Sequence, residues 1–167
     1  MKLARYLALA TTPFAALSIF NIYRRSFGVS LNDWMAGIAE ETSRIVTGIV
    51  DAPAQNLLGW DPPQLLSDMW IFSLWWTGVM ASATVGAMKD KGDPTPWSSQ
   101  LVMLPIRLFL GYSLIGFFWA ATVIPITFAK FKTGDDDLDR YGHWIRVFTL
   151  TCAFIVAALF MLNSVSL

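Results

Sequence analysis

Side chains that commonly carry chemistry are few in this sequence. Cys152 is the only cysteine and His143 the only histidine among 167 residues. A disulfide or a CxxC redox pair needs a second cysteine, and a Ser/His/Asp triad, a two-histidine haem or a typical zinc site would rest on His143 alone. We therefore predict that the chain is not an enzyme, and we assign it no catalytic, cofactor-binding or metal-binding residue.

The acidic run GDDDLDRYGHW invites comparison with a calcium-binding loop. Such a loop needs Gly at its sixth position and Glu at its twelfth, whereas counting from Asp135 places Arg140 and Arg146 there. We interpret the run as a solvated loop that brings negative charge to the start of the next helix. A looser cation site that involves Asp135, Asp137 and Asp139 stays open as an alternative.

Residues 83–94 read ATVGAMKDKGDP and contain the first three letters of the potassium-channel filter TVGYG. The Tyr and second Gly that complete this filter are absent. The preceding apolar run would be about 40 Å long as a helix, which is too long for a pore helix that enters half of a membrane. Lys89, Gly92 and Pro94 are typical of a helix C-terminus, so we predict that a helix ends here.

Composition places the chain among membrane proteins. Hydrophobic residues make up 55% of the sequence and charged residues 14%, and the mean hydropathy is positive. The 12 basic and 12 acidic side chains cancel, which leaves no excess of cations for nucleic-acid phosphates. We expect an integral membrane protein that is in contact with the lipid bilayer and binds no nucleic acid.

Four apolar stretches are long enough to cross a bilayer as helices, which takes about 20 residues. They comprise residues 6–23, 62–88, 101–129 and 144–165, with approximate ends. No small-x-small cleavage site closes the first stretch, so we interpret it as a retained helix rather than a signal peptide. Asp61 is expected to cap the second helix. The predicted fold class is all-α, with residues 1–167 forming a single membrane domain of four transmembrane helices.

A further segment, at about residues 31–50, is too polar to cross a membrane and has the pattern of an amphipathic helix. Its predicted docking face consists of Leu31, Trp34, Met35, Ile38, Ile45 and Ile49. Ser30 is expected to start this helix and Pro53 to end it. Its polar face is acidic and therefore poorly suited to anionic lipids. The apolar face packs either on the chain's own spans or on another subunit.

Gly78, Ser82 and Gly86 recur every four residues along the second predicted span. Small residues at this spacing allow another helix to approach closely. We predict a helix-packing interface here, with either a partner protein or another span of the same chain. Weaker rows of small residues lie in the third and fourth spans, at Gly116, Ala120, Ala153 and Ala157.

Arginine and tryptophan side chains near the span ends are predicted to anchor the protein at the membrane surface. These interfacial anchors are Arg107, Trp60, Trp70, Trp97 and Trp144. Three further tryptophans, Trp75, Trp76 and Trp119, lie deeper and are interpreted as packing residues. Bound lipid is expected, and a pigment or quinone beside these three rings stays an alternative.

The predicted spans contain no Asp, Glu or His in their interiors, so an ion-coupled transporter lacks its usual parts. We therefore expect a non-catalytic accessory subunit of a cell (inner) membrane. It would cross the membrane several times, with both termini outside. It would pack against other membrane proteins or copies of itself, in a complex of respiratory, photosynthetic or secretion type. The alternatives are a homo-oligomeric pore or holin-like channel, and a small enzyme or electron carrier that borrows ligands from a partner.

Overall fold

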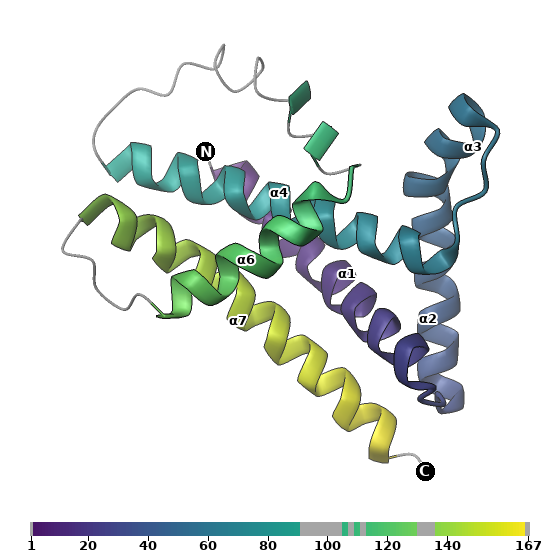
Figure 1. Ribbon diagram of the computed structural model, residues 1–167. Coiled ribbons are helices and arrows are strands. Elements are labelled where there is room, and N and C mark those ends of the chain that lie inside the picture. The colour runs from purple at the N-terminus through teal and green to yellow at the C-terminus, as the bar shows by residue number, and fades with distance from the viewer. Residues whose placement is uncertain (1, 91–104, 107–108, 111–112, 130–135, 166–167) are drawn as a thin grey trace.

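The computed structural model describes residues 2–90, 105–106, 109–110, 113–129 and 136–165. Within these residues the chain is helical and forms no strand, so the predicted all-helical class is confirmed (Figure 1). Four transmembrane helices are not supported. One helix among the described residues is long and apolar enough to cross a bilayer, and it comprises Tyr141–Val165.

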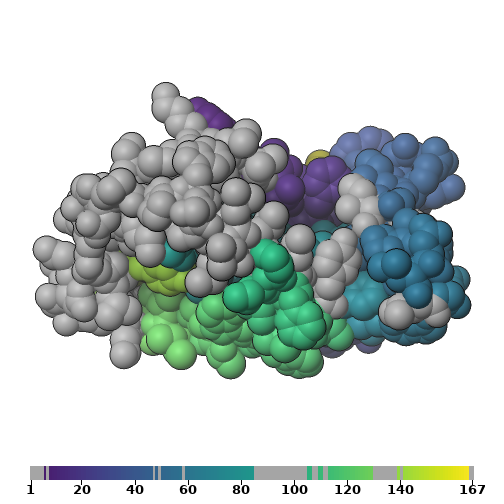
Figure 2. Space-filling model, turned by 90° about the horizontal axis from the view of Figure 1, so that it is seen from above, coloured from purple at the N-terminus to yellow at the C-terminus, as the bar shows by residue number. Residues whose placement is uncertain are grey.

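Three long helices form the body of the molecule. The helices are α1 (Lys2–Phe27), α2 (Asp33–Val46), the π-helical η1 (Thr47–Asp51), α3 (Ala52–Leu58), α4 (Gln64–Asp90), α6 (Ile115–Ala129) and α7 (Asp136–Val165). α1, α4 and α7 pack against one another, and α6 lies across α4 and α7 (Figure 1). Phe20, Trp76 and Phe148 are buried where the three long helices meet. α2 and α3 lie together at one end of the molecule (Figure 2).

The third predicted span is shorter in the structure than in the sequence pattern. α6 has 15 residues and is therefore about 22 Å long, whereas the hydrocarbon core of a bilayer is about 30 Å thick. Leu114, just before it, has a φ angle of 58°, a left-handed conformation that ends a regular helix. Residues 101–104, 107–108 and 111–112 of this predicted span lie outside the described residues.

The predicted amphipathic helix consists of α2, η1 and α3 rather than one regular helix. Asn32 caps α2, because its Oδ1 accepts a hydrogen bond of 2.8 Å from the Met35 N–H. The cap is therefore not Ser30. Pro53 does not end the segment, since it lies in the first turn of α3, where a missing N–H removes no helical bond. The segment ends at Gly59, which has a left-handed φ of 61°.

A cap at Asp61 predicts that the helix begins at Pro62, whereas α4 begins at Gln64. The carbonyl of Pro63 accepts the first helical bonds. Pro62 is kept out of the helix because a residue that precedes a proline disfavours the helical conformation. The carboxylate of Asp61 instead accepts a hydrogen bond of 2.9 Å from Gln55 Nε2, so it ties the loop to α3 rather than capping α4.

Two buried asparagines tie the end of α7 to the loop between α1 and α2. The Asn32 N–H donates to Asn163 Oδ1 at 3.1 Å, and Asn32 Nδ2 donates to the Leu162 carbonyl at 3.0 Å. Asn163 Nδ2 donates to the Ser30 carbonyl at 3.0 Å. We call this contact the asparagine clasp. Because buried polar groups are costly when unpaired, the clasp fixes both segments.

Asn163→Leu is expected to lower the free energy of unfolding by about 1–2 kcal/mol, because it leaves polar groups of the clasp without partners. Thermal unfolding of the purified chain in mild detergent measures the change. Ser164→Leu is the matched control. Ser164 is exposed and its hydroxyl donates to Met161 within the same helix, so a change within about 0.5 kcal/mol is expected. Equal losses in the two variants would contradict the role of the clasp.

Candidate functional site

The predicted docking face of the amphipathic helix is turned partly into the chain's own core. Met35 has no exposed surface, and Leu31 and Ile38 are partly buried against the same core. Thr42 and Val46 of α2 are also buried. This part of the face therefore packs on the chain's own helices, which is one of the two arrangements that the pattern allows.

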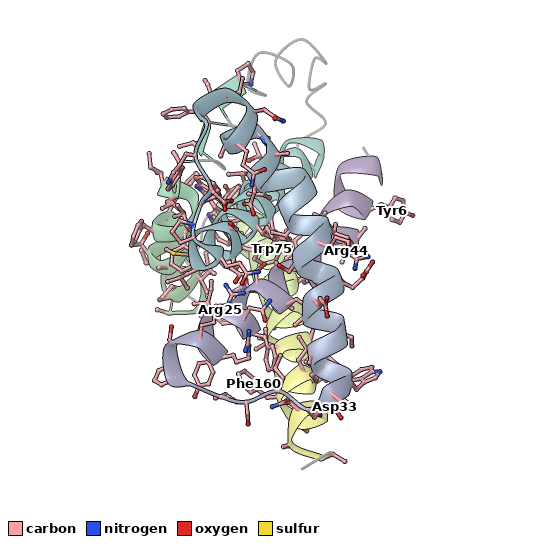
Figure 3. All side chains as sticks on the ribbon, turned by 90° about the vertical axis from the view of Figure 1, so that its right-hand side faces the viewer. Tyr6, Arg25, Asp33, Arg44, Trp75 and Phe160 are labelled. Atoms are coloured by element: carbon pink, nitrogen blue, oxygen red, sulfur yellow. The ribbon has the colours of Figure 1, made fainter. Side chains whose placement is uncertain are left out.

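The other part of this face lies at the surface. Trp34 is 58% exposed and Ile45 is 41% exposed, while the side chain of Ile49 lies outside the described residues. Arg44 points away from α2 into the surroundings (Figure 3) and pairs with Glu41 at 3.3 Å. α2 thus keeps an exposed apolar edge beside a charged face.

The small-residue row of α4 is covered only in part. Ser82 is 2% exposed. Around Gly78, by contrast, no heavy atom of the described residues lies within 4 Å of the position that a Cβ would take, α4's own backbone aside. The surroundings of Gly86 lie outside the described residues. A partner contact at this row stays a prediction, and the described part of the chain leaves room for one at Gly78.

A different pair of small residues makes the close contact between α4 and α6. A Cβ added to Gly116 would overlap Ser73 Oγ and would lie 3.2 Å from the Ser73 carbonyl oxygen. Ser73 Oγ also donates to the Leu110 carbonyl at 3.3 Å. Gly116 belongs to one of the weaker predicted rows, whereas Ser73 stands in none of them. The spacing of small residues did not identify this contact, because Ser73 lies outside the row of small residues on α4.

The described tryptophan anchors lie at or near the surface. Trp60 is 43% exposed, and its ring meets that of Trp70 edge to face at a centroid distance of 6.0 Å. Trp144 is partly buried. Arg107 and Trp97 lie outside the described residues. Anchoring of these side chains at a membrane surface stays a prediction.

The deeper tryptophans differ in their surroundings. Trp76 has no exposed surface, Trp75 is 4% exposed and Trp119 is 38% exposed. Trp75 lies in the middle of the bundle (Figure 3), where its indole N–H donates to Thr12 Oγ1 at 3.1 Å. The Thr12 hydroxyl in turn donates to the Ala8 carbonyl at 2.7 Å. These bonds fix the Trp75 ring between α4 and α1.

Trp75 also lines two apolar cavities. The larger, of about 410 Å³, lies between α1, α4, α6 and α7 and includes Ile19 and Cys152 in its lining. The smaller, of about 240 Å³, lies between α1, α4 and the α2–η1 segment and includes Phe14 and Val46. Cavities of several hundred Å³ with mostly apolar linings are typical sites for small apolar ligands.

A buried polar cluster joins α1 to α4. Arg25 Nη1 donates to Asp68 Oδ2 at 2.8 Å, and Arg25 Nη2 donates to Gln64 Oε1 at 2.7 Å. Beside this pair, Ser67 Oγ donates to Asp51 Oδ1 at 2.7 Å. Asp51 and Asp68 are 4% and 5% exposed. The hydrogen bonds offset part of the cost of burying these carboxylates, and they hold α1, η1 and α4 together.

This cluster corrects one expectation. Asp68 lies within the second predicted span, residues 62–88, and it is a buried acid on a long apolar helix. A signal was available in the sequence. Arg25 stands at the end of one apolar stretch and Asp68 near the start of the next, and such positions meet when the two helices pack antiparallel. The cluster positions helices, since Asp68 is paired with Arg25 and Asp51 accepts a hydrogen bond from Ser67.

The outer faces of α6 and α7 carry large apolar side chains. Phe118, Ile126, Phe154 and Met161 are each more than half exposed. Among the described residues, no three His, Cys, Asp or Glu side chains lie together in a group that could hold a metal ion.

No protein-family model, curated protein or solved structure matches the chain.

Proposed function

We propose that this chain is a non-catalytic, multi-pass integral membrane protein of a cell (inner) membrane that packs against other membrane proteins and stabilises or links a larger complex. The observation that carries the proposal is the exposure of α7. Its segment Tyr141–Val165 is apolar enough to cross a bilayer, and only 22% of its most apolar 18-residue stretch is buried inside the protein. The core helix of a soluble protein would be mostly buried, whereas a helix this apolar and this exposed fits lipid.

The packing of α1 and α4 along α7 extends the proposal to these helices. α4 has 27 residues and α1 has 26, and each is about 40 Å long, enough to cross the hydrocarbon. We therefore propose that α1, α4 and α7 cross side by side. α6 would enter the bilayer beside them without crossing it. Because the asparagine clasp joins the C-terminal end of α7 to the loop that follows α1, this arrangement puts the two termini on opposite sides of the membrane, and it replaces the expectation that both lie outside.

Two features on the surface supply the contact with partners. Trp34 and Ile45 form an exposed apolar edge on α2, and aromatic side chains of this kind are common anchors at protein interfaces. The described residues leave space at Gly78 on α4, where a neighbouring helix can approach the backbone closely. The partner would be another membrane protein subunit or a second copy of this chain.

Gly78→Leu is expected to remove the chain from its complex while leaving its own fold intact, because the described residues leave space around Gly78. Native-gel migration in mild detergent, followed by identification of co-migrating proteins, measures assembly. We expect at least a roughly tenfold loss of the assembled form, which corresponds to about 1.4 kcal/mol. Ala121→Leu, at an exposed position of α6, is the control and should assemble normally.

Wild-type protein that migrates alone as a monomer would overturn the proposed function. Assembly that persists in Gly78→Leu would show that α4 does not make the contact. Trp34→Ala then tests the apolar edge of α2 by the same measurement. Solute leak from liposomes that contain only this chain would favour the pore alternative instead.

A further inference from the structure

We propose that the cavity of about 410 Å³ between α1, α4, α6 and α7 binds one elongated lipophilic molecule with a hydrogen-bonding oxygen at one end. An acyl lipid or a quinone with a hydrocarbon tail has this chemistry. The proposal goes beyond assembly, because every residue that forms the cavity belongs to this chain.

The size and the lining of the cavity fit such a ligand. Ligand pockets typically measure about 300–1,000 Å³. Apolar side chains come from all four helices, including Ile19 from α1, Phe72 and Trp75 from α4, Ile124 from α6 and Phe160 from α7. The cavity opens to the surface along α7, where Ala153 and Ala157 are exposed, and its apolar lining holds water poorly. A hydrocarbon chain seated there would cover this apolar surface.

The cavity is long in the direction of α7. Its α7 lining begins at Thr149 and continues to Phe160, a separation of about 16 Å along the helix axis. The two ends differ in chemistry, since one has a hydroxyl and the other an aromatic ring. An extended chain with a polar head fits this layout better than a compact molecule does.

The hydroxyl of Thr149 marks the polar end. Its Oγ1 is buried and has no hydrogen-bond partner among the described residues. Thr151, two residues later, instead donates to the Val147 carbonyl of its own helix at 2.8 Å. A buried hydroxyl without a partner costs free energy. Rotation of the Thr149 side chain about χ1 would turn this covered hydroxyl toward the cavity that the residue lines, where a carbonyl or hydroxyl oxygen of a ligand would satisfy it.

The first test is extraction of bound lipophiles from the full chain, purified and washed in mild detergent. Mass spectrometry identifies and quantifies them, and absorbance distinguishes a quinone from an acyl lipid. Ala157 is exposed and contributes to the lining, so Ala157→Phe would fill the mouth of the cavity without disturbing the core. We expect this variant to retain at least about tenfold less ligand. Ala121→Phe, on the exposed surface of α6, is the matched control and should retain as much as wild type.

Absence of any retained lipophile from the wild type would overturn the proposal. Equal retention in the wild type, Ala157→Phe and Ala121→Phe would overturn it too, because lipid bound generally around the protein does not respond to one cavity. A quinone band and an acyl lipid both support the proposal and identify the source of the ligand.

The second test concerns the polar end of the ligand. Delipidated protein is reloaded with oleic acid or with decyl benzoquinone, and the affinity for each probe is measured in detergent. Thr149→Val keeps the shape of the side chain and removes its hydroxyl, so the probe that binds wild type should bind about fivefold more weakly. Thr151→Val is the control, with no change expected. Equal affinities in the two variants would overturn the assignment of Thr149, and failure of both probes to bind wild type would overturn the site.

Discussion

Arg25→Met is expected to lower the free energy of unfolding by about 3 kcal/mol, because it removes the cation that is hydrogen-bonded to the buried carboxylate of Asp68. Arg25 is bonded to Asp68 at 2.8 Å and to Gln64 at 2.7 Å, so the substitution removes two bonds at once. Methionine keeps most of the apolar length of the arginine side chain, and the loss is therefore mainly electrostatic. Thermal or denaturant unfolding of the purified chain in mild detergent measures it.

Arg44→Met is the matched control. Its pair with Glu41 is 3.3 Å long, and the two side chains are 73% and 63% exposed, so the loss should stay below about 1 kcal/mol. A double variant, Arg25→Met with Asp68→Leu, removes both charges and should regain most of the stability. Similar small losses at Arg25 and Arg44 would contradict the buried pair, as would a double variant no more stable than Arg25→Met.

Gly116→Ala is expected to lower the free energy of unfolding by about 2–3 kcal/mol. The added methyl group would overlap Ser73 Oγ and crowd the Ser73 and Leu110 carbonyl oxygens. The Ser73 hydroxyl must rotate and lose its bond to the Leu110 carbonyl, and the two carbonyl oxygens still press α6 away from α4, so overpacking of this kind is costly. The measurement is again unfolding in mild detergent. A second substitution, Ser73→Gly, removes the overlapping hydroxyl and should restore part of the loss.

Gly78→Ala is the control for this effect, and its expected sign is opposite. No described heavy atom lies within 4 Å of a Cβ at Gly78, apart from α4's own backbone, so the methyl group fits. Alanine favours a helix interior over glycine by roughly 0.5–1 kcal/mol, and unfolding should become harder by up to that amount. Equal destabilisation at Gly78 and Gly116 would show that the close contact of α4 and α6 is not specific to Gly116.

Local features of the sequence predicted the long helices well. α1, α4 and α7 contain the stretches 6–23, 62–88 and 144–165 almost in full, because a long apolar run fixes a helix without help from distant residues. The sequence pattern also placed residues 84–86 inside a helix, and Thr84 Oγ1 bonds the Met80 carbonyl of that helix. The filter resemblance therefore falls on a regular part of α4.

Features that depend on contacts between distant residues were not predictable in the same way. Arg25 and Asp68 are 43 positions apart, and their pairing requires α1 and α4 to pack antiparallel in one register. The left-handed conformation of Leu114 has no signal in the residue type, because leucine ordinarily favours a helix. The π-helical turn η1 changes the angle per residue, so a face drawn at 100° per residue does not hold beyond Val46.

The asparagine clasp has a consequence for biosynthesis. Asn32 and Asn163 are 131 positions apart, and at typical elongation rates of about 5–20 residues per second the ribosome needs roughly ten seconds to pass from one to the other. During this interval the loop between α1 and α2 has no Asn163 to bond, and water must solvate its polar groups. The nascent chain therefore completes the attachment of α2 only after α7 has been made.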